Sequence, residues 1–481
     1  MDASEFEVRK EAVLAECEVA PAIFERVVPR LERFMEPFVA SLGRRERAEH
    51  ALTLVQGLLS DLSHKNVESI AYRFGQERLP LQNFVGTSEW DDGVLRDELA
   101  RQIGRELGEP DGVLVFDPSG FPKSGRESVG VARQWCGRLG KTDNCQVAVF
   151  LGDVSRREHA LVDMRLYLPE EWTQDAARMK KAGVPQGTKF RTRHQLVLEM
   201  LARHGRTLPH QWITGDDELG RPSWFRRDLR ALHEQYLFAV PSNTSIRDLE
   251  VEPPAGTGIG RPRKRPWQRV SAWTQSQPDT AWTTIDVRDG SKGPLIVEVL
   301  KRRVRTRNDK RQESPDDEML VVIRYRDRDQ TTVTKTDYHL SNALPETPLA
   351  EFARAAQAEH RIEECFRRAK SEAGLADYEV RTWRGWHHHQ TLSLIATWFL
   401  VTESRRGKKM DPGNHAATNP DRHLPNPPPR MRLRHTSPHP TRLPTTPATQ
   451  RTRPRPSLET TQPTGATQHQ QAANLRRSNS P

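Results

Sequence analysis

The sequence predicts an α/β fold: a mixed sheet with a β-rich insertion, a helical N-terminal domain and a disordered C-terminal tail. Three observations support it. Apolar segments of strand length recur between residues 113 and 245, with a helical segment among them. Residues 294–307 and 318–340 alternate between apolar and polar side chains, as antiparallel strands do. Helical spacing of apolar residues dominates residues 1–105 and returns from residue 348.

The composition predicts a cytoplasmic protein. No apolar run approaches the roughly 20 residues that a membrane-spanning helix needs. The acidic N-terminus lacks the basic start and apolar centre of a signal peptide. The four cysteines are scattered without a CxxC pair, which argues against a disulfide framework or a zinc ribbon: Cys17, Cys136, Cys145 and Cys365.

The net charge of +10 comes from one end of the chain. Residues 403–481 carry 14 Lys/Arg and 4 Asp/Glu, which already gives +10. The preceding 402 residues are therefore neutral overall. The high isoelectric point says little about the folded part.

The N-terminal domain, residues 1–105, is expected to be helical. Apolar residues at three- and four-residue spacing run through residues 49–62 and 69–76. Acidic residues outnumber basic ones here, whereas small DNA-binding helical domains are usually basic. Two readings stay open, a scaffold and a DNA-binding domain with a local patch at Arg44, Arg45 and Arg47.

Residues 106–245 are expected to form the first part of the mixed α/β core. The strand "VLVF" (113–116) runs into Asp117, followed by a predicted Pro/Ser/Gly turn. Further predicted elements are strands at 145–155 and 159–169, a helix at 191–205, and strands in "QWITGDDELG" (211–220) and "QYLFAVPSNT" (235–244).

Residues 246–345 are expected to form a basic β-rich insertion. Residues 256–312 carry 14 Lys/Arg and 5 Asp/Glu, with Trp267, Trp273 and Trp282 among them. Cations with interleaved aromatic residues favour DNA contact, for which the candidates are Arg263, Lys264, Arg265 and Trp267. The alternative is a solvated edge, since Lys and Arg also guard exposed strands.

Two helices, 348–374 and 387–403, are expected to close the core within residues 346–409. Three consecutive histidines at 387–389 point in different directions around a helix start, so a three-histidine metal site is not expected. Residues 410–481 are rich in Pro, Arg and Thr, which predicts disorder. The abrupt change of composition there fits either a reading-frame shift or a basic arm that touches DNA.

Three acidic residues lie at places where a folded sheet could bring them together: Asp117, Asp216 and Glu363. Asp217 is an equal candidate for the second position on periodicity alone. On the predicted helix, Ile362, Cys365, Phe366 and Ala369 share a core face, while Glu363, Arg367 and Lys370 flank it. Glu364 is expected to point to solvent. The plain alternative for Glu363 is an i,i+4 ion pair with Arg367.

The segments "FDPSGFPKSGRESVGVARQWCGRLGKTDNCQVAVFL", "WITGDDELG" and "RIEECFRRAKSEAGLADYEVRTWRGWHHHQTLSLIA" resemble the DDE transposases of bacterial insertion sequences. They are most similar to the family conventionally numbered seven hundred and one, within the IS4-like superfamily. The similarity covers residues 25 to 409. It implies a ribonuclease-H-like core, cleavage of double-stranded DNA at terminal inverted repeats, joining to target DNA, and a nucleoid-associated homodimer.

The resemblance also implies site residues. Asp117, Asp216 and Glu363 match the three metal-binding acids, which would hold two Mg²⁺ or Mn²⁺ ions. Lys370 matches the lysine of the superfamily's Tyr-Arg-Glu-Lys signature, and Arg367 lies where a further basic residue is common. Ala356 and Glu359 replace the Tyr and Arg, so those two phosphate contacts are either absent or supplied by another residue, for which Arg361 is the candidate.

Three functions remain open at this point: an active transposase, a catalytically inactive DNA-binding remnant with an altered C-terminus, and a stand-alone nuclease of the same fold. The basic insertion disfavours a minimal nuclease. It does not distinguish an active transposase from an inactive one.

Overall fold

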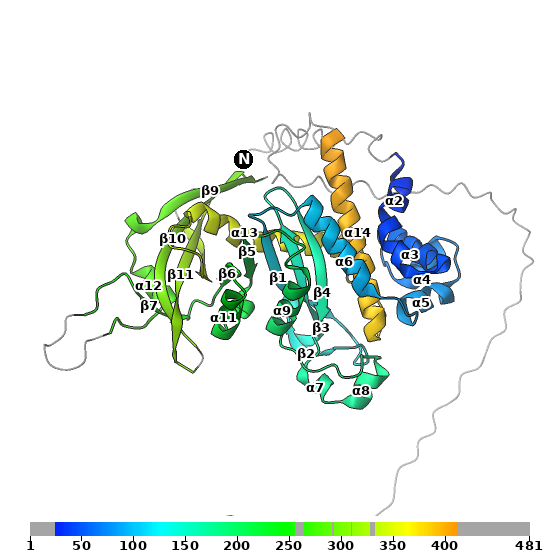
Figure 1. The fold of residues 1–481 in the computed structure, drawn as a ribbon, viewed down its shortest axis with the longest axis horizontal. Coiled ribbons are helices and arrows are strands. Elements are labelled where there is room, and N and C mark those ends of the chain that lie inside the picture. The colour runs from blue at the N-terminus through cyan, green and yellow to red at the C-terminus, as the bar shows by residue number, and fades with distance from the viewer. Residues whose placement is uncertain (1–24, 255–263, 291–292, 309, 328–331, 411–481) are drawn as a thin grey trace, which may run out of the picture. The chain divides into compact units, whose positions relative to one another are not determined.

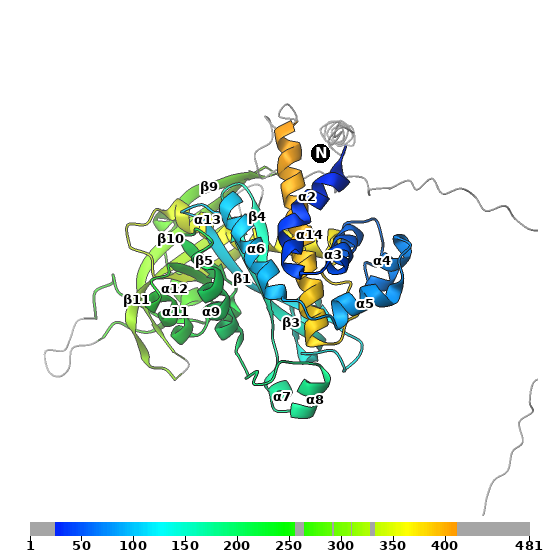
Figure 2. The same ribbon diagram turned by 45° about the vertical axis from the view of Figure 1, so that its right-hand side comes forward.

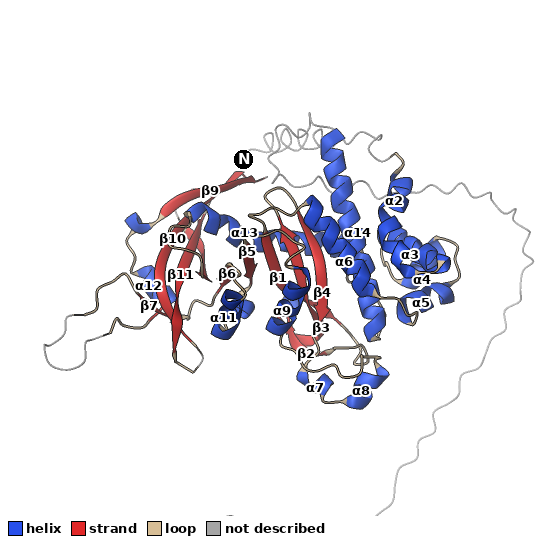
Figure 3. Ribbon diagram, in the orientation of Figure 1, coloured by secondary structure: helices blue, strands red, loops and turns tan. Residues whose placement is uncertain are grey.

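The structure is a computed structural model that describes residues 25–254, 264–290, 293–308, 310–327 and 332–410. The predicted tail from residue 411 onward and Arg263 lie outside the described residues. The described elements combine one large mixed sheet with many helices, so the predicted α/β class is confirmed (Figures 1 and 3). Within this part of the chain, no helix is both long and apolar enough to cross a membrane.

A single mixed sheet organises the chain (Figure 3). Its order is β2–β3–β1–β5–β6–β12–β11–β10–β7–β8, with β4 paired to β3 and β9 paired to β10. The strands up to β6 are β1 (Val113–Pro122), β2 (Ala132–Cys136), β3 (Lys141–Val154), β4 (His159–Leu166), β5 (Trp212–Gly215) and β6 (Tyr236–Ala239).

Strands β4–β3–β1–β5–β6 form the core of this sheet. β3 runs antiparallel to both β1 and β4, whereas β5 is parallel to β1 and β6 is parallel to β5. Three antiparallel strands followed by two parallel ones is the arrangement expected of a ribonuclease-H-like core. The predicted strands and the order in which they follow one another are therefore confirmed.

One local prediction is wrong: the chain does not turn after Asp117. β1 continues through Pro118, Ser119 and Gly120 to Pro122 and pairs with β3 along its whole length. β5 pairs only with residues 113–116 of β1. Among the described residues, the other edge of β1 therefore has no strand partner from Asp117 onward, and an edge is where a proline in a strand is tolerated.

Two helices cover opposite faces of the core strands. On β3, Phe150 meets Phe366 of α13 (Leu349–Glu372) edge-to-face, with ring centres 5.0 Å apart. The next residue of β3 faces the other way and is paired with Asp163 of β4. Asp163 accepts a hydrogen bond from His204 of α9 (Arg193–His204), so α9 lies on the opposite face.

The N-terminal helices gather around the long helix α14 (Trp383–Met410), as two views show (Figures 1 and 2). Phe34 packs edge-to-face on Phe399, and Trp398 of α14 donates to Gln102. The predicted helical character of this region is confirmed from Val27 onward, while residues 1–24 lie outside the described residues. Its helices are α2 (Val27–Val39), α3 (Arg45–Leu58), α4 (Val67–Arg73), α5 (Arg78–Gly86) and α6 (Asp92–Glu106).

The predicted insertion is rich in strands, as expected (Figure 3). It contains one short helix, α12 (Val270–Gln275), beside the remaining strands. These are β7 (Ser245–Asp248), β8 (Gln268–Arg269), β9 (Thr283–Gly290), β10 (Gly293–Arg307), β11 (Glu313–Arg326) and β12 (Val333–Ser341). β12 pairs with β6, so the insertion extends the core sheet.

Two of the three tryptophans of the insertion pack in its own apolar core. Trp273 is buried and donates its indole N–H to Asp248, while Trp282 packs against the same apolar cluster beneath Arg324. Two of the three residues that favoured DNA contact are thus explained by packing. A small strand-rich segment needs large apolar side chains for its core, whatever it binds.

Candidate active site

Asp117 and Asp216 lie side by side at the same end of adjacent parallel strands. Phe116 of β1 is in register with Gly215 of β5, and the two aspartates follow these residues. Asp117 is paired with Phe150 across β3 and therefore shares its face, the one that α13 covers. Asp216 caps the short helix α10 (Asp217–Gly220) by accepting the Leu219 backbone N–H at 3.0 Å.

Helix α13 comes close to the sheet because a glycine makes room for it. A Cβ built on Gly152 of β3 would lie 1.8 Å from Cδ1 of Ile362. The predicted core face of the helix is buried, as expected, at Ile362, Cys365, Phe366 and Ala369. This contact sets the height of α13 above the two aspartates.

Two glutamates of α13 face the aspartates from different depths. Glu359 is half-buried, and Thr214 of β5 lies 3.4 Å from its Oε1. Glu363, one turn later, has a side chain 72 % exposed and lies 3.6 Å from His360. Sequence reasoning missed Glu359 as part of the site, although a carboxylate where the superfamily has arginine was a visible signal.

The prediction for Glu364 is wrong. Its side chain is only 24 % exposed, donors on Arg368 lie 3.1 Å away, and His159 of β4 lies at 3.8 Å. A helical wheel places Glu364 opposite the core face of α13, but β4 covers that flank of the helix.

Crowding of carboxylates perturbs their protonation. Burial, followed by repulsion from Asp216 and Glu363, raises the pKa of Asp117 to about 8. Burial and the neighbouring Glu218 and Asp217 raise the pKa of Asp216 to about 6, against the opposing Leu219 N–H.

Glu359 shares this environment, whereas Glu363 does not. Burial, together with Asp216 and Asp117, raises the pKa of Glu359 to about 8. His360 lowers the pKa of Glu363. The Asp117–Asp216–Glu359 group thus holds negative charge poorly without a cation.

Basic residues of α13 are placed differently from one another. Lys370 donates to Ser119 Oγ at 2.9 Å, two residues beyond Asp117 on β1. Arg367 is 67 % exposed and lies 3.9 Å from Glu364, whereas Arg361 is half-buried. The predicted stripe on α13 contains two cations, Arg367 and Lys370. Of these two, Lys370 is the one that lies close to the aspartates.

The insertion contributes to the rim of the site. Tyr325 of β11 accepts a hydrogen bond from Gln357 of α13 at 2.7 Å. Lys335 of β12 lies 2.8 Å from Asp337. The charge of Lys335 helps to lower the pKa of Glu363, and the charge of Asp337 helps to raise the pKa of Glu359.

The predicted DNA-binding residues of the insertion do not all present themselves to a ligand. Lys264 is exposed and lies 3.9 Å from Glu313, and Arg265 donates to the Val251 carbonyl. The ring of Trp267 is contacted by Arg247 and Arg307, with guanidinium carbons 4.3 and 4.0 Å from its centre. Much of the Trp267 ring is therefore already covered.

Oxygen donors at the site suit a hard cation such as Mg²⁺, which binds through one or two carboxylates together with substrate phosphates. As the side chains are placed, no three His, Cys, Asp or Glu groups in the described ranges converge closely enough to hold a metal ion. The two adjacent aspartates, with their raised pKa values, fit such a cation as a pair. A third protein ligand would come from α13.

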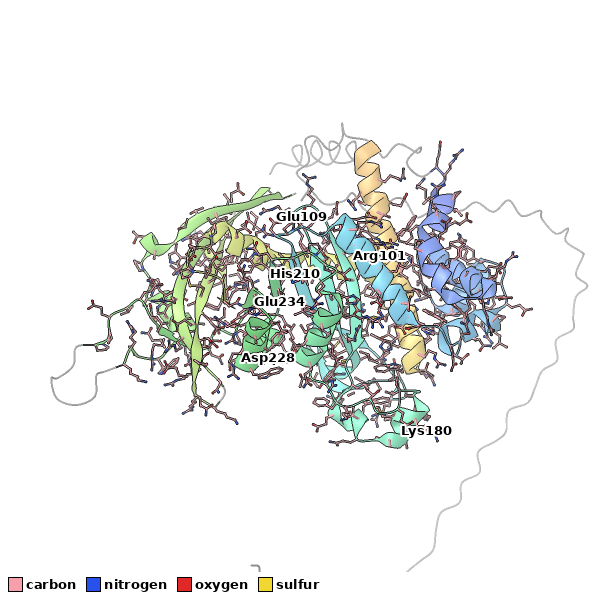
Figure 4. All side chains as sticks on the ribbon, viewed as in Figure 1. Arg101, Glu109, Lys180, His210, Asp228 and Glu234 are labelled. Carbon is pink, nitrogen blue, oxygen red and sulfur yellow. The ribbon has the colours of Figure 1, made fainter. Side chains whose placement is uncertain are left out.

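Other acid and histidine groups lie outside this site. His210 and Glu234, both labelled in Figure 4, pair at 3.1 Å. They precede β5 and β6, whereas Asp216 follows β5, so they lie at the other end of these strands. His387, His388 and His389 are buried, and each bonds to a backbone carbonyl. Burial lowers the pKa of all three, which fits neutral packing residues.

Comparison with known proteins agrees with this geometry. A probable transposase for insertion sequence element IS701 from Microchaete diplosiphon is 30% identical over 201 residues, covering 40% of this chain and 49% of that protein. The chain thus spans about half the length of this curated relative. The profile of the DDE superfamily endonucleases matches residues 37–294, a stretch that includes Asp117 and Asp216. Since that match covers more than half of the sequence, the chain belongs to the DDE superfamily endonucleases.

Proposed function

We propose that this protein is an insertion-sequence transposase that cuts DNA at terminal inverted repeats and joins the freed 3′ ends to target DNA. One observation carries the proposal: Asp117 and Asp216 directly follow the last paired residues of the parallel strands β1 and β5, beneath a helix that brings further carboxylates. The similarity to a probable insertion-sequence transposase supports it. We assign double-stranded DNA as substrate and a homodimer as the working form, since two ends must be held together.

The residues have separate roles in this proposal. Asp117, Asp216 and Glu363 would hold Mg²⁺ or Mn²⁺, two ions in the fully loaded site. Bound metal supplies Lewis-acid activation of the attacking oxygen and stabilises the leaving oxygen in an in-line displacement. The sheet fixes Asp117 and Asp216 before substrate arrives, so little reorganisation is needed. No histidine base is required.

Lys370 is positioned to bind the phosphate that is cut. Its ammonium bonds to Ser119, two residues from Asp117, and is partly withdrawn from solvent. Burial lowers the pKa of Lys370, while Asp117 opposes that shift and favours the charged form. Arg367, exposed on the same stripe of α13, would contact DNA further from the cut.

Cleavage of DNA that carries the terminal repeats of this insertion sequence tests the proposal. With Mg²⁺ or Mn²⁺, the wild-type chain should cut at the repeat ends, and Asp117→Asn should not. Asp217→Asn is the matched control, because Asp217 is the exposed neighbour of Asp216 and pairs with Arg221 at 3.5 Å. Equal cleavage by Asp117→Asn and wild type would contradict the metal-site assignment.

A second candidate is a DNA-binding remnant without catalytic activity. The exposure of Glu363, which does not converge with the two aspartates closely enough to hold a metal ion in the described residues, favours this reading. A remnant would bind repeat DNA but release no 3′ ends under any metal condition, whereas an active transposase would release them.

A further inference from the structure

One tryptophan of this chain is exposed, and it lies beside the carboxylate site. All eleven tryptophans fall in the described residues, and ten of them are buried or half-buried. Trp135 of β2 is 55 % exposed. Because a tryptophan has a large apolar surface, leaving it in water forgoes a substantial stabilisation. Its position therefore calls for a reason other than folding.

The hairpin that carries Trp135 has the charge of an anion-binding surface. β2 and the start of β3 pair from Ala132–Cys145 to Cys136–Lys141, joined by the short turn Gly137–Leu139. Residues 128–142 contain three cations and no Asp or Glu: Arg133, Arg138 and Lys141. Asp143, just beyond, pairs with Lys141 at 3.0 Å.

The exposed side chains of the hairpin form one surface. Arg133 and Trp135 alternate with Gln134 and the buried Cys136, so they share the outward face of β2. At the turn, Arg138 and the 41 % exposed Leu139 follow directly. An apolar side chain at the tip and an aromatic ring on the face are thus framed by cations.

This surface adjoins the carboxylate site through β1. A Cβ built on Gly120 would lie 2.9 Å from Sγ of Cys136, so β2 passes close to β1 three residues after Asp117. Ser119, the preceding residue, accepts the hydrogen bond of Lys370. Arg138 is near enough to Lys370 to act on its charge. A DNA strand held by Lys370 would therefore continue towards the hairpin.

We propose that the β2–β3 hairpin, residues 132–145, binds the DNA that flanks the cut, with Arg133, Arg138 and Lys141 on phosphates and Trp135 on an unstacked base. Leu139 is the apolar wedge of this surface. The inference rests on the proposed function for its substrate. Bases stack on aromatic side chains in a sequence-tolerant way, and apolar side chains unstack base steps.

Fluorescence anisotropy on two labelled probes tests the hairpin. One probe is a 30-bp duplex, and the other is the same duplex with a three-nucleotide unpaired bubble at its centre. Wild type should prefer the bubble, and Trp135→Ala should lower bubble affinity about tenfold while changing duplex affinity less, as expected from stacking energies. Trp135→Phe should keep most of the preference. The control is Tyr72→Ala, which removes a 68 % exposed aromatic residue on α4 and should change neither affinity.

The arginines of the hairpin should affect DNA affinity differently from Trp135. Arg133→Gln with Arg138→Gln should weaken binding to both probes alike and reduce the slope of log affinity against log salt by about two. Melting followed by circular dichroism should match wild type for every hairpin variant, because the replaced side chains are exposed.

Two results would overturn the inference: equal bubble affinity for Trp135→Ala and wild type, or an equal loss in Tyr72→Ala. If wild type binds the probes and only the hairpin variants show no effect, the hairpin assignment fails and the transposase proposal stands. If wild type binds neither probe, both proposals fail.

Discussion

At the scale of single residues, the structure separates acids that the sequence presents alike. Asp216 and Asp217 are consecutive, yet Asp216 caps α10 beside Asp117 and Asp217 is exposed. Strand register causes this difference, because it aligns Phe116 with Gly215 and so places the residue after each one at a common edge. The carboxylates at that edge oppose folding and favour a cation.

The first prediction concerns the stability that the protein loses when the Asp117 carboxylate ionises in the folded state. Because the pKa of Asp117 is raised from 3.8 to about 8 in the folded protein, the folded state binds a proton that the unfolded chain has released. Stability should therefore fall as pH rises between those two values. At pH 8, Asp117→Asn should raise the thermal midpoint by about 2–4 °C.

A bound metal ion should remove this loss of stability, because it neutralises the ionised carboxylates. Millimolar Mg²⁺ or Mn²⁺ should raise the wild-type midpoint at pH 8, since a ligand of the folded state stabilises it, and should raise that of Asp117→Asn less. Calorimetry at pH 5 and pH 8, with and without metal, measures both effects. A midpoint lower in Asp117→Asn than in wild type at pH 8 would refute the argument.

The second prediction distinguishes the glutamates of α13. If Glu363 is the third metal ligand, Glu363→Gln should reduce cleavage by at least a hundredfold and leave the melting midpoint unchanged, because its side chain is exposed. Glu359→Gln should raise the midpoint, because it removes a crowded carboxylate, and should reduce cleavage less.

Glu364→Gln is the matched control, since Glu364 is adjacent but pairs with Arg368. It should retain cleavage. Cleavage that survives in Glu363→Gln but disappears in Glu359→Gln would identify Glu359, one turn earlier on α13, as the third metal ligand instead of Glu363. Mn²⁺ affinity, measured by electron paramagnetic resonance, tests metal binding in each variant independently of DNA cleavage.

At the scale of elements, most of the fold could be predicted from sequence, and the exceptions have physical causes. Apolar spacing predicted the core strands and helices α9 and α13, because each of these helices buries a stripe of apolar residues. Helix α14 was also predicted, and it is buried on every side over residues 385–399. β2 was missed because its outward face carries Arg133 and Trp135 rather than an apolar pattern. The extension of β1 was missed because Pro118 and Gly120 are typical of turns, and pairing with β3 overrides that preference.

The site could be predicted only in part, for a related reason. Asp117 and Asp216 each follow an apolar strand segment that the sequence shows. The depth of Glu359 depends on how closely α13 approaches the sheet, and that depends on Gly152, 207 residues earlier in the chain. Spacing along one helix contains no information about that contact.

The third prediction tests this contact. Gly152→Ala should destabilise the protein by about 1–3 kcal/mol, because its Cβ would overlap Ile362 and force α13 away from the aspartates. Cleavage should fall with it. Ile362→Val removes the overlapping Cδ1 at a cost of about 0.5–1.5 kcal/mol.

The double variant should therefore be more stable than the sum of the two costs predicts, with a coupling above about 0.5 kcal/mol. Gly86→Ala is the control, because no atom lies within 4 Å of a Cβ at that position. Additive costs in urea denaturation would show that Gly152 and Ile362 do not set the height of the helix.

At the scale of the whole molecule, the insertion and the core share one sheet and one buried ion pair. β12 pairs with β6 at residues 339–341, and Arg226 of α11 (Ser223–Ala231) bonds to Glu318 of β11 through two nitrogens. Tyr236 of β6 and Thr306 of β10 also donate to Glu318, at 2.7 and 2.9 Å. The helix that anchors the insertion follows directly on the segment that holds Asp216. Anchorage of the insertion and alignment of the site should therefore be linked.

The fourth prediction follows from this network. Arg226→Met should cost about 3–5 kcal/mol, because it leaves the Glu318 carboxylate buried without its cation, and should reduce cleavage by displacing α10. Arg305→Gln removes a half-buried pair with Asp317 on neighbouring strands, which water still reaches, and should cost no more than about 1 kcal/mol. Arg226→Met combined with Glu318→Met should recover much of the loss.

The pH dependence of stability should identify the pair directly. Burial opposes ionisation of Glu318, but Arg226 and the hydroxyl donors lower its pKa below the usual 4.5. The pair therefore contributes stability above that pH, and the contribution is lost as pH falls through the lowered value. Wild type should lose stability more steeply than the double variant in this acid range. Hydrogen exchange at residues 237–239 should increase in Arg226→Met if the pair ties the insertion to the core, and unchanged exchange there would show that β6–β12 pairing suffices.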